Sequence, residues 1–218
     1  MTVEHWVISP SDPDPGILAR AAEVLREGGV IVFPTDTLYG LAADARNPAA
    51  VATIFRMKGR AQEEPLPLVA ASLEQAEREA AEFSRLGRCL AARFWPGPLT
   101  LVLPVRASLA PGVSAGTGTV AVRVPDHAVA RQLASLAGFT LTATSANRSG
   151  FPPAATAAEA AAGLEGGEDG LRGVLDAGVT PGGPPSTIVD ARGDEPRLIR
   201  AGAIAWERVV EALRAVDR

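Results

Sequence analysis

The chain has 218 residues, 47% of them hydrophobic, which is enough to bury the core of one large domain or two small ones. Its formal net charge of -4 argues against a general nucleic-acid coat, because such proteins carry a basic field over much of their surface. Cys89 is the only cysteine and His5 and His127 are the only histidines, so the sequence excludes a disulfide framework and argues against a zinc centre.

The first predicted elements lead to a polar turn. Residues 3–8 predict a short strand, and Asp14-Pro15 supplies an N-cap and a first-turn proline for a helix that Gly28-Gly29 ends. Residues 30–33, Val-Ile-Val-Phe, are typical of a strand covered on both faces, and Thr35-Asp36-Thr37 follows its carboxyl end. Ligands of open α/β sheets collect at that edge. Asp36 suits either an Asx turn or a contact to a ligand amine.

The next helix ends on the only lysine of the chain. After an extended piece at residues 38–43, Asn47-Pro48 opens a helix that delivers Lys58-Gly59-Arg60 at its C-terminal end. A compact ammonium differs chemically from a planar guanidinium, so one lysine among 21 basic residues is informative. Lys58 is either a phosphate contact or a solvated side chain that complements the helix dipole.

The middle of the chain predicts helical structure followed by two strands and a loop. The capping box Ser72-Leu73-Glu74-Gln75 starts a helical region that runs to about Trp95, with Gly87 as a candidate interruption. The stretch 108–119, rich in Gly, Ser and Thr, predicts a loop over the site. Apolar runs predict short strands at residues 66–70, 99–103 and 120–124.

Arg123 lies inside the last of these apolar runs. A buried arginine needs a partner, which is a carboxylate either of the protein or of a ligand. Pro125-Asp126 predicts the cap of the next helix. We expect His127 to be exposed in its first turn, because nothing nearby would orient it as a base.

The last third of the chain predicts short strands and two helices. Residues 139–144 predict a strand that ends in the polar turn Ser145–Gly150. Thr156 and Glu159 form a second capping box, and residues 205–216 an amphipathic helix. Closing strands are expected at residues 174–176, 187–190 and 197–200, after a flexible connection at 163–173. No repeat and no linker divides residues 1–218, so we expect a single domain. For its fold we expect the α/β class, with a twisted, largely open mixed sheet flanked by helices.

Polar residues gather at the predicted strand ends, where a ligand cleft is expected. They are Thr35, Thr37, Lys58, Arg60, Arg123, Ser145, Asn147, Ser186 and Arg200. Four cations with several hydroxyls suit a ligand that carries phosphates and a carboxylate. Taken singly, the threonines, Ser145 and Asn147 are also ordinary turn formers. The chain lacks the Gly-rich nucleotide motifs G-x-x-x-x-G-K-[ST] and G-x-G-x-x-G, and it lacks the nucleophile motif G-x-S-x-G, so covalent catalysis is not indicated.

Seven segments carry a resemblance to a known family. In chain order they are PTDTLYGLAADA, KGRAQEEPL, FWPGPLTLVLP, VAVRVP, TATSANRSG, PSTIVD and LIRAGAI. Together they resemble the YrdC/TsaC family of threonylcarbamoyl-AMP synthases over about residues 16–204. The combination Lys-x-Arg followed much later by Ser-x-Asn, here Lys58, Arg60, Ser145 and Asn147, is the most specific part of the match.

The resemblance implies a YrdC/RibB-like fold and an adenylate-forming enzyme. The family joins L-threonine, bicarbonate or CO2 and ATP into threonylcarbamoyl-AMP and pyrophosphate, the first step toward N6-threonylcarbamoyladenosine at position 37 of tRNA. By resemblance, Mg2+ accompanies ATP, Lys58 and Arg60 are the catalytic cations, and a tRNA threonylcarbamoyltransferase takes the product. The implied ATP-binding residues are Lys58, Arg60, Thr119, Ser145, Asn147 and Arg200, and the implied threonine-binding residues are Thr35, Thr37, Arg123, Ala143 and Ser186.

The chain departs from many relatives at Leu68-Val69-Ala70, where they carry a histidine, so one threonine contact of the family is missing here. Its length implies the single-domain form of the family. Two other functions stay open: a tRNA- or rRNA-binding module without catalysis, and a carbamoyl-transfer domain like that of hydrogenase maturation proteins. The acidic total and 5% aromatic content argue against the RNA-binding module and allow only a weak RNA contact.

The sequence predicts a cytoplasmic protein without a membrane segment. No apolar run approaches the ~18 to 20 residues that a membrane-spanning helix needs. The N-terminus carries acidic residues where a signal peptide would carry positive charge ahead of an apolar stretch.

Overall fold

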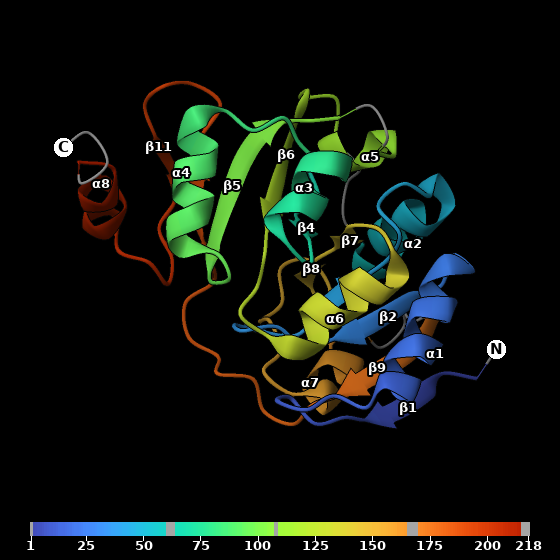
Figure 1. Cartoon of the computed structure of the whole chain (residues 1–218). Coiled ribbons are helices and arrows are strands. Elements are labelled where there is room, and N and C mark those ends of the chain that lie inside the picture. Colours follow the sequence, from blue (N-terminus) through green and yellow to red (C-terminus); the bar gives the residue numbers. More distant parts are fainter. Residues whose placement is uncertain (1, 60–63, 107–108, 165–169, 215–218) are drawn as a thin grey trace.

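A computed structural model describes residues 2–59, 64–106, 109–164 and 170–214 of the chain. Their strands form two sheets, with helices packed against both (Figure 1). The helices are α1 (Pro15–Arg26), α2 (Pro48–Lys58), α3 (Leu73–Glu79), α4 (Arg85–Phe94), α5 (Pro111–Ser114), α6 (Ala128–Ala137), α7 (Ala157–Ala162) and α8 (Trp206–Arg214). None of the helices described is long and apolar enough to cross a membrane.

The first sheet has five strands in the order β1-β9-β2-β3-β8. β9 is parallel to both of its neighbours, β1 and β2. β3 is antiparallel to both of its neighbours, β2 and β8. The strands are β1 (Glu4–Val7), β2 (Val30–Phe33), β3 (Gly40–Ala42), β8 (Thr144–Ser145) and β9 (Leu171–Asp176).

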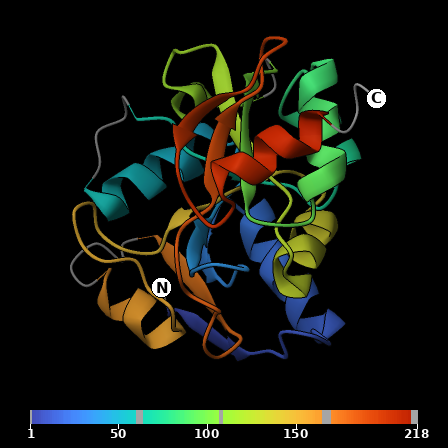
Figure 2. The same cartoon turned by 90° about the vertical axis from the view of Figure 1, so that its left-hand side faces the viewer.

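The second sheet has six strands in the order β11-β10-β5-β6-β4-β7. β10 is parallel to β5, β4 is parallel to β6, and the other neighbours are antiparallel. The strands are β4 (Leu68–Val69), β5 (Leu99–Pro104), β6 (Thr119–Arg123), β7 (Leu141–Thr142), β10 (Thr187–Asp190) and β11 (Arg197–Arg200). Figure 2 views the molecule from the side of β11 and α8.

The predicted fold class, α/β with open mixed sheets flanked by helices, is confirmed, and the structure adds that the strands divide between two sheets. The predicted strand at residues 139–144 is two short strands. β7 pairs in the second sheet and β8 in the first, so the chain changes sheets at Ala143. The Ala143 amide donates to Pro67 O at 2.8 Å and fixes the crossing point.

Strand β2 separates two hydrophobic cores, as its uninterrupted apolar sequence predicts. All four of its residues are buried. Val30 and Val32 belong to the larger core, whereas Ile31 and Phe33 face the core formed with α1 and α6. Alternate side chains of a strand point to opposite faces, so a strand with apolar residues on both faces is covered by packing on both.

The predicted starts of α1, α2 and α7 are confirmed, and each has hydrogen bonds between the N-cap side chain and amides of the first helical turn. The Asp14 and Asn47 side chains each accept two backbone N–H groups, and Thr156 with Glu159 forms both bonds of a capping box. Gly59 ends α2 at φ 57°, in the left-handed region that favours glycine.

Three local predictions were wrong. The helical region after Ser72 breaks at residues 80–84, where Ala81 bridges to Val105, while Gly87 lies inside α4. A Cβ on Gly87 would lie 3.0 Å from Leu103 Cδ2, so this glycine lets α4 pack closely on β5. The predicted loop before β6 contains the short helix α5.

The third error concerns the start of α6. Its N-cap residue is His127 rather than Asp126. His127 is half-buried rather than exposed, with Nδ1 buried and without a hydrogen bond among the described residues. Its burial lowers the pKa of the imidazole, an effect that the negative charge of Asp36 opposes.

Candidate active site

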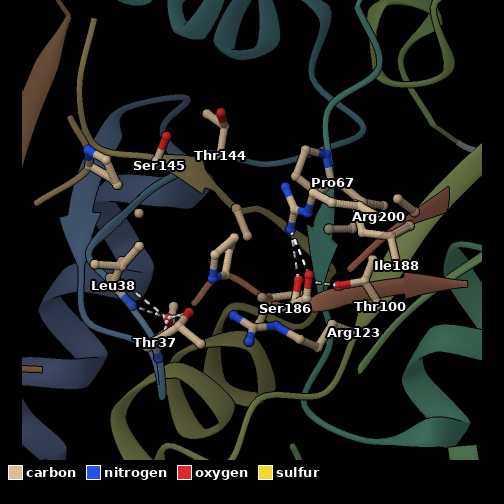
Figure 3. Close-up of a pocket in the computed structure, with 18 of the residues that line it drawn as sticks. Thr37, Leu38, Pro67, Thr100, Arg123, Thr144, Ser145, Ser186, Ile188 and Arg200 are labelled. Carbon is tan, nitrogen blue, oxygen red and sulfur yellow. Dashed lines mark hydrogen bonds between the residues drawn. The ribbon is translucent and has the colours of Figure 1, made fainter. Parts of the chain in front are cut away.

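A cavity of about 660 Å³ lies between the two sheets (Figure 3). Its volume falls in the range of about 300 to 1,000 Å³ that is typical of small-molecule sites. The first sheet contributes the residues that follow β2 together with β3 and β8, and the second sheet contributes one face of β5, β6 and β10.

Strand alternation explains how the second sheet forms the cavity wall. On β5, Leu99 and Leu101 belong to the hydrophobic core, whereas Thr100 between them lines the cavity. On β6, Val122 is in the core and Arg123 lines the cavity. The period of two in a strand therefore places polar side chains in the cavity while the opposite face stays apolar.

The structure brings most of the predicted site residues together. Those that line the cavity are Thr35, Thr37, Thr119, Arg123, Ala143, Ser145, Asn147, Ser186 and Arg200. Lys58 is described but is not among the lining residues, because its side chain lies within the protein next to Ser145 and Asn147. Arg60 lies outside the described residues.

The two threonines after β2 form a compact turn. The Thr35 hydroxyl donates to Leu38 O at 2.7 Å and accepts from the Thr37 amide at 3.2 Å. The hydroxyls of Thr35 and Thr37 lie 3.1 Å apart, and both residues are buried. Thr35 thus acts as a turn former and also holds the Thr37 hydroxyl at the cavity wall.

Arg123 has a partner within the protein. Its Nη1 lies 3.0 Å from Asp36 Oδ1, and the two side chains are only 9% and 10% exposed. The two groups form an ion pair by distance but are not aligned as a hydrogen bond, and neither Asp36 oxygen has a hydrogen bond among the described residues. Burial lowers the pKa of Arg123, and the Asp36 charge opposes this shift.

A second guanidinium lies near the first on the same side of the cavity (Figure 3). Arg200 Nη2 donates to Ser186 O at 2.8 Å and to Ser186 Oγ at 3.3 Å. The Ser186 hydroxyl also lies 2.8 Å from Thr100 Oγ1. Arg200 disfavours the charged form of Arg123, and partial burial lowers the pKa of Arg200 itself. An anionic ligand between the two arginines would relieve this repulsion.

The turn after β8 forms the opposite wall. Ser145 and Asn147 line the cavity, and the Asn147 side chain also donates to Arg148 O at 3.0 Å and to Phe151 O at 2.6 Å. Phe151 is 63% exposed and lines the cavity, as does Ile199 at 60%. The rim therefore offers apolar surface beside the polar walls.

Sequence reasoning missed Thr100, Phe151 and Ile199 as lining residues. Thr100 was detectable, because a threonine between two leucines of a strand lies on the opposite face from them. Phe151 and Ile199 carry no such local pattern. β4 borders the cavity with Leu68 and Val69, so this part of the cavity wall is apolar.

The chain's described residues do not form a magnesium site. No three His, Cys, Asp or Glu side chains gather among them. The described residues that line the cavity include no carboxylate, whereas protein-bound Mg2+ normally takes at least one. The residues at hand thus do not fit a protein-held Mg2+ ion.

Residues 23–202 match the model of the Sua5_yciO_yrdC family, described as Telomere recombination. The chain belongs to the Sua5/YciO/YrdC family. The threonylcarbamoyl-AMP synthase of Bacillus subtilis (strain 168) is 40% identical over 214 residues, covering 96% of this chain and 61% of the relative. A relative of similar length from Mycobacterium tuberculosis (strain ATCC 25618 / H37Rv) is 36% identical, with 98% of this chain and 96% of the relative covered.

Solved structures of the Sua5/YciO/YrdC family share the fold. Pyrococcus abyssi Sua5 complexed with L-threonine superposes with a TM-score of 0.88 at 36% identity, covering 98% of this chain and 61% of that one. Escherichia coli YciO superposes with a TM-score of 0.82 at 23% identity, a likeness of fold alone. This chain thus spans about three fifths of the length of its B. subtilis and P. abyssi relatives.

Proposed function

We propose that the chain is an L-threonylcarbamoyladenylate synthase, a nucleotidyltransferase that joins L-threonine, bicarbonate or CO2 and ATP into threonylcarbamoyl-AMP and pyrophosphate. The observation that carries the proposal is the buried Arg123, which faces a cavity of about 660 Å³ together with hydroxyls and a second arginine. The name of the B. subtilis relative and the L-threonine complex of P. abyssi Sua5 support this choice.

We assign the threonine to the Arg123 side of the cavity. Arginine has five N–H donors, so the ion pair with Asp36 leaves donors for the amino acid's carboxylate. The hydroxyls of Thr37 and Ser186, the backbone at Ala143 and the nearby Thr35 would orient the substrate. β4 would contact the threonine only through the apolar side chains of Leu68 and Val69.

We assign the nucleotide to the part of the cavity that lies between the turn after β8 and Arg200 of β11. The proposed contacts are Thr119, Ser145, Asn147 and Arg200, all of which line the cavity, with Arg60 from the Lys-x-Arg segment. Lys58 is assigned to this side as well, because its ammonium touches Ser145 and Asn147. Mg2+ enters with ATP as part of the substrate.

The proposed chemistry needs positioning and charge neutralisation. The threonine amine adds to CO2 and loses a proton to solvent, which gives a carbamate whose oxygen attacks the α-phosphorus of ATP. The bond from the α-phosphorus to the bridging oxygen breaks, and pyrophosphate leaves with that oxygen. Because two anions approach each other, cations fixed around them lower the barrier more than mobile ones would. We assign this role to Arg200, Arg60 and Lys58 on the nucleotide side, with Arg123 neutralising the carboxylate of the threonine.

A pyrophosphate-release assay without RNA tests the proposal. We expect release from ATP to require both bicarbonate and L-threonine, with L-serine and L-valine giving much lower rates. Arg200→Met should lower kcat/KM by about a hundred- to thousandfold, the usual effect of removing one charge-stabilising donor. Arg197→Met, on the same strand but not lining the cavity, is the matched control and should stay near the wild-type rate. Release that does not depend on threonine would refute the assignment.

The same assay separates this function from RNA binding without catalysis. An RNA-binding module would bind tRNA yet release no pyrophosphate. We propose further that the product passes to a tRNA threonylcarbamoyltransferase for modification at position 37, and that any RNA contact of this chain is weak. We therefore also propose a cytoplasmic location, where ATP and tRNA are present.

A further inference from the structure

Residues 177–186, which we call the strap, connect the two sheets beside the cavity. The strap leaves β9 of the first sheet and leads into β10 of the second. Its last residue, Ser186, lines the cavity across from Thr37, which follows β2 (Figure 3). Both hydroxyls belong to the side that we assign to threonine, so the path of the strap bears on how far apart these two walls stand.

The first half of the strap is bound to the first-sheet side of the cavity. The Tyr39 hydroxyl, just before β3, donates to Gly178 O at 2.7 Å. The amide and the hydroxyl of Thr180 both donate to Ala155 O, at 2.9 and 3.1 Å. Thr180 is buried, so water does not compete freely for these bonds. This half of the strap therefore keeps the position of the first sheet.

The second half of the strap is bound to the second sheet. The Ser186 hydroxyl lies 2.8 Å from Thr100 Oγ1 on β5. The amide of Ala203, after β11, donates to Pro185 O at 2.9 Å. Gly202 packs so closely on the same carbonyl that it leaves no room for a Cβ. Ser186 therefore keeps the position of the second sheet.

The two halves meet at Gly182 and Gly183. The Gly182 amide donates to Thr37 O at 2.9 Å, whereas Gly183 and Pro184 form no hydrogen bond with any described residue. Gly182 has a φ of 67° and Gly183 a φ of 83°, both in the left-handed region that favours glycine. A Cβ on either residue would meet no atom within 4 Å. Glycine is thus needed here for its backbone conformation and not for close packing.

We propose that Gly182 and Gly183 are positioning residues for the amino acid substrate. Their left-handed backbone turns the strap from the wall that carries Thr37 to the wall that carries Ser186, and so sets the separation of the two hydroxyls. A residue that disfavours this conformation strains the junction, and moving the two walls relative to each other relieves the strain. The inference rests on the proposed function for the identity of the substrate.

Two matched glycine variants test the positioning role. Gly138 ends α6 with the same φ of 83° as Gly183, and it too has open space around a Cβ. Gly183→Ala and Gly138→Ala should therefore lose similar stability to urea. Only Gly183→Ala should raise the KM for L-threonine in the pyrophosphate-release assay, by about tenfold, with kcat near the wild-type value. An unchanged KM for threonine, or an equal rise in the KM for ATP, would overturn the proposal.

A third variant, Gly183→Asn, separates backbone conformation from side-chain size. Asparagine is larger than alanine but adopts the left-handed conformation much more readily. Its KM for L-threonine should therefore lie well below that of Gly183→Ala and close to the wild-type value. A KM as high as that of Gly183→Ala would make side-chain bulk the cause and would overturn the proposal.

Hydrogen exchange in the ligand-free protein needs no activity. Because the Gly182 amide is bonded to Thr37 O, Gly183→Ala should speed its exchange by about tenfold, whereas Gly138→Ala should not. Unchanged exchange of this amide in Gly183→Ala would overturn the proposal. A wild-type protein that releases no pyrophosphate in the presence of L-threonine and bicarbonate would instead refute the proposed function, and the exchange result would still decide whether Gly183 holds the strap on Thr37.

Discussion

The ion pair of Asp36 and Arg123 gives a sharp test of how deeply the site is buried. Asp36→Asn keeps the size of the side chain but removes its charge, which leaves Arg123 without its carboxylate partner. The Arg123 guanidinium would then stand in a desolvated position beside a second cation, Arg200. We expect the variant to fold but to lose much of its stability.

The expected loss of stability follows from the burial of the ion pair rather than from the distance between its two charged groups. The pair is 3.0 Å apart with side chains 9% and 10% exposed. Breaking a buried pair by removing one partner costs about 3 to 5 kcal/mol, because an uncompensated charge stays inside the protein. Arg88 and Glu77 are closer, at 2.7 Å, but their side chains are 59% and 30% exposed. Surface pairs of this kind contribute about 0 to 1 kcal/mol.

Urea denaturation of the two variants provides the assay. Asp36→Asn should lower the free energy of unfolding several times more than the matched control Glu77→Gln. Equal effects would refute the reasoning, because they would mean that water reaches Asp36 and Arg123 as freely as it reaches the surface pair. Adding L-threonine should restore part of the stability of Asp36→Asn, since its carboxylate would offer Arg123 a new partner.

Three further predictions concern single groups. Burial raises the pKa of Tyr39 to about 12, so its ultraviolet titration should show no ionisation near pH 10. The unfolded phenol ionises near pH ~10, and stability should therefore fall as the pH rises from about 10 to 12. Burial lowers the pKa of His127, so stability should fall as the pH drops below the unfolded value of ~6.5. Gly202→Ala should raise the KM for threonine, because its Cβ would lie 2.5 Å from the Ser186 carbonyl carbon.

Each of these predictions has its own control. A Tyr39 titration with a midpoint near that of free tyrosine would contradict the burial of its phenol. His127→Gln should flatten the acid limb of the stability profile, whereas His5→Gln should not, and equal effects would remove His127 as the cause. Gly193→Ala places its Cβ in open space, so a KM change equal to that of Gly202→Ala would contradict the steric explanation.

Local features of the fold were predictable from sequence because their causes lie within a few residues. The Asp14 and Asn47 side chains accept hydrogen bonds from amides two or three residues later in the chain. The capping box joins Thr156 and Glu159, which are three residues apart. Along β5 and β6, successive side chains point to opposite faces, so one face of each strand lies in the hydrophobic core. These patterns determine helix starts and strand faces without reference to the rest of the chain.

The candidate site was predictable as a set of residue types but not as a geometry. Segments far apart in the chain supplied hydroxyls and cations, and the structure places most of them around one cavity. The partner of Arg123 stayed open in the sequence, since a charge inside an apolar run needs a partner but does not name it. Asp36, 87 positions earlier, is brought next to it only by the folded chain.

By itself, the sequence determined the caps, the apolar strand faces, the α/β class and the family resemblance, since each depends on neighbouring residues or on ordered motifs. Only the tertiary structure decided that the strands form two sheets, that the chain changes sheets at Ala143, and that Lys58 is buried. The ammonium of Lys58 meets oxygens 87 and 89 positions away. Contacts over such separations depend on how sheets pack, and no local pattern encodes them.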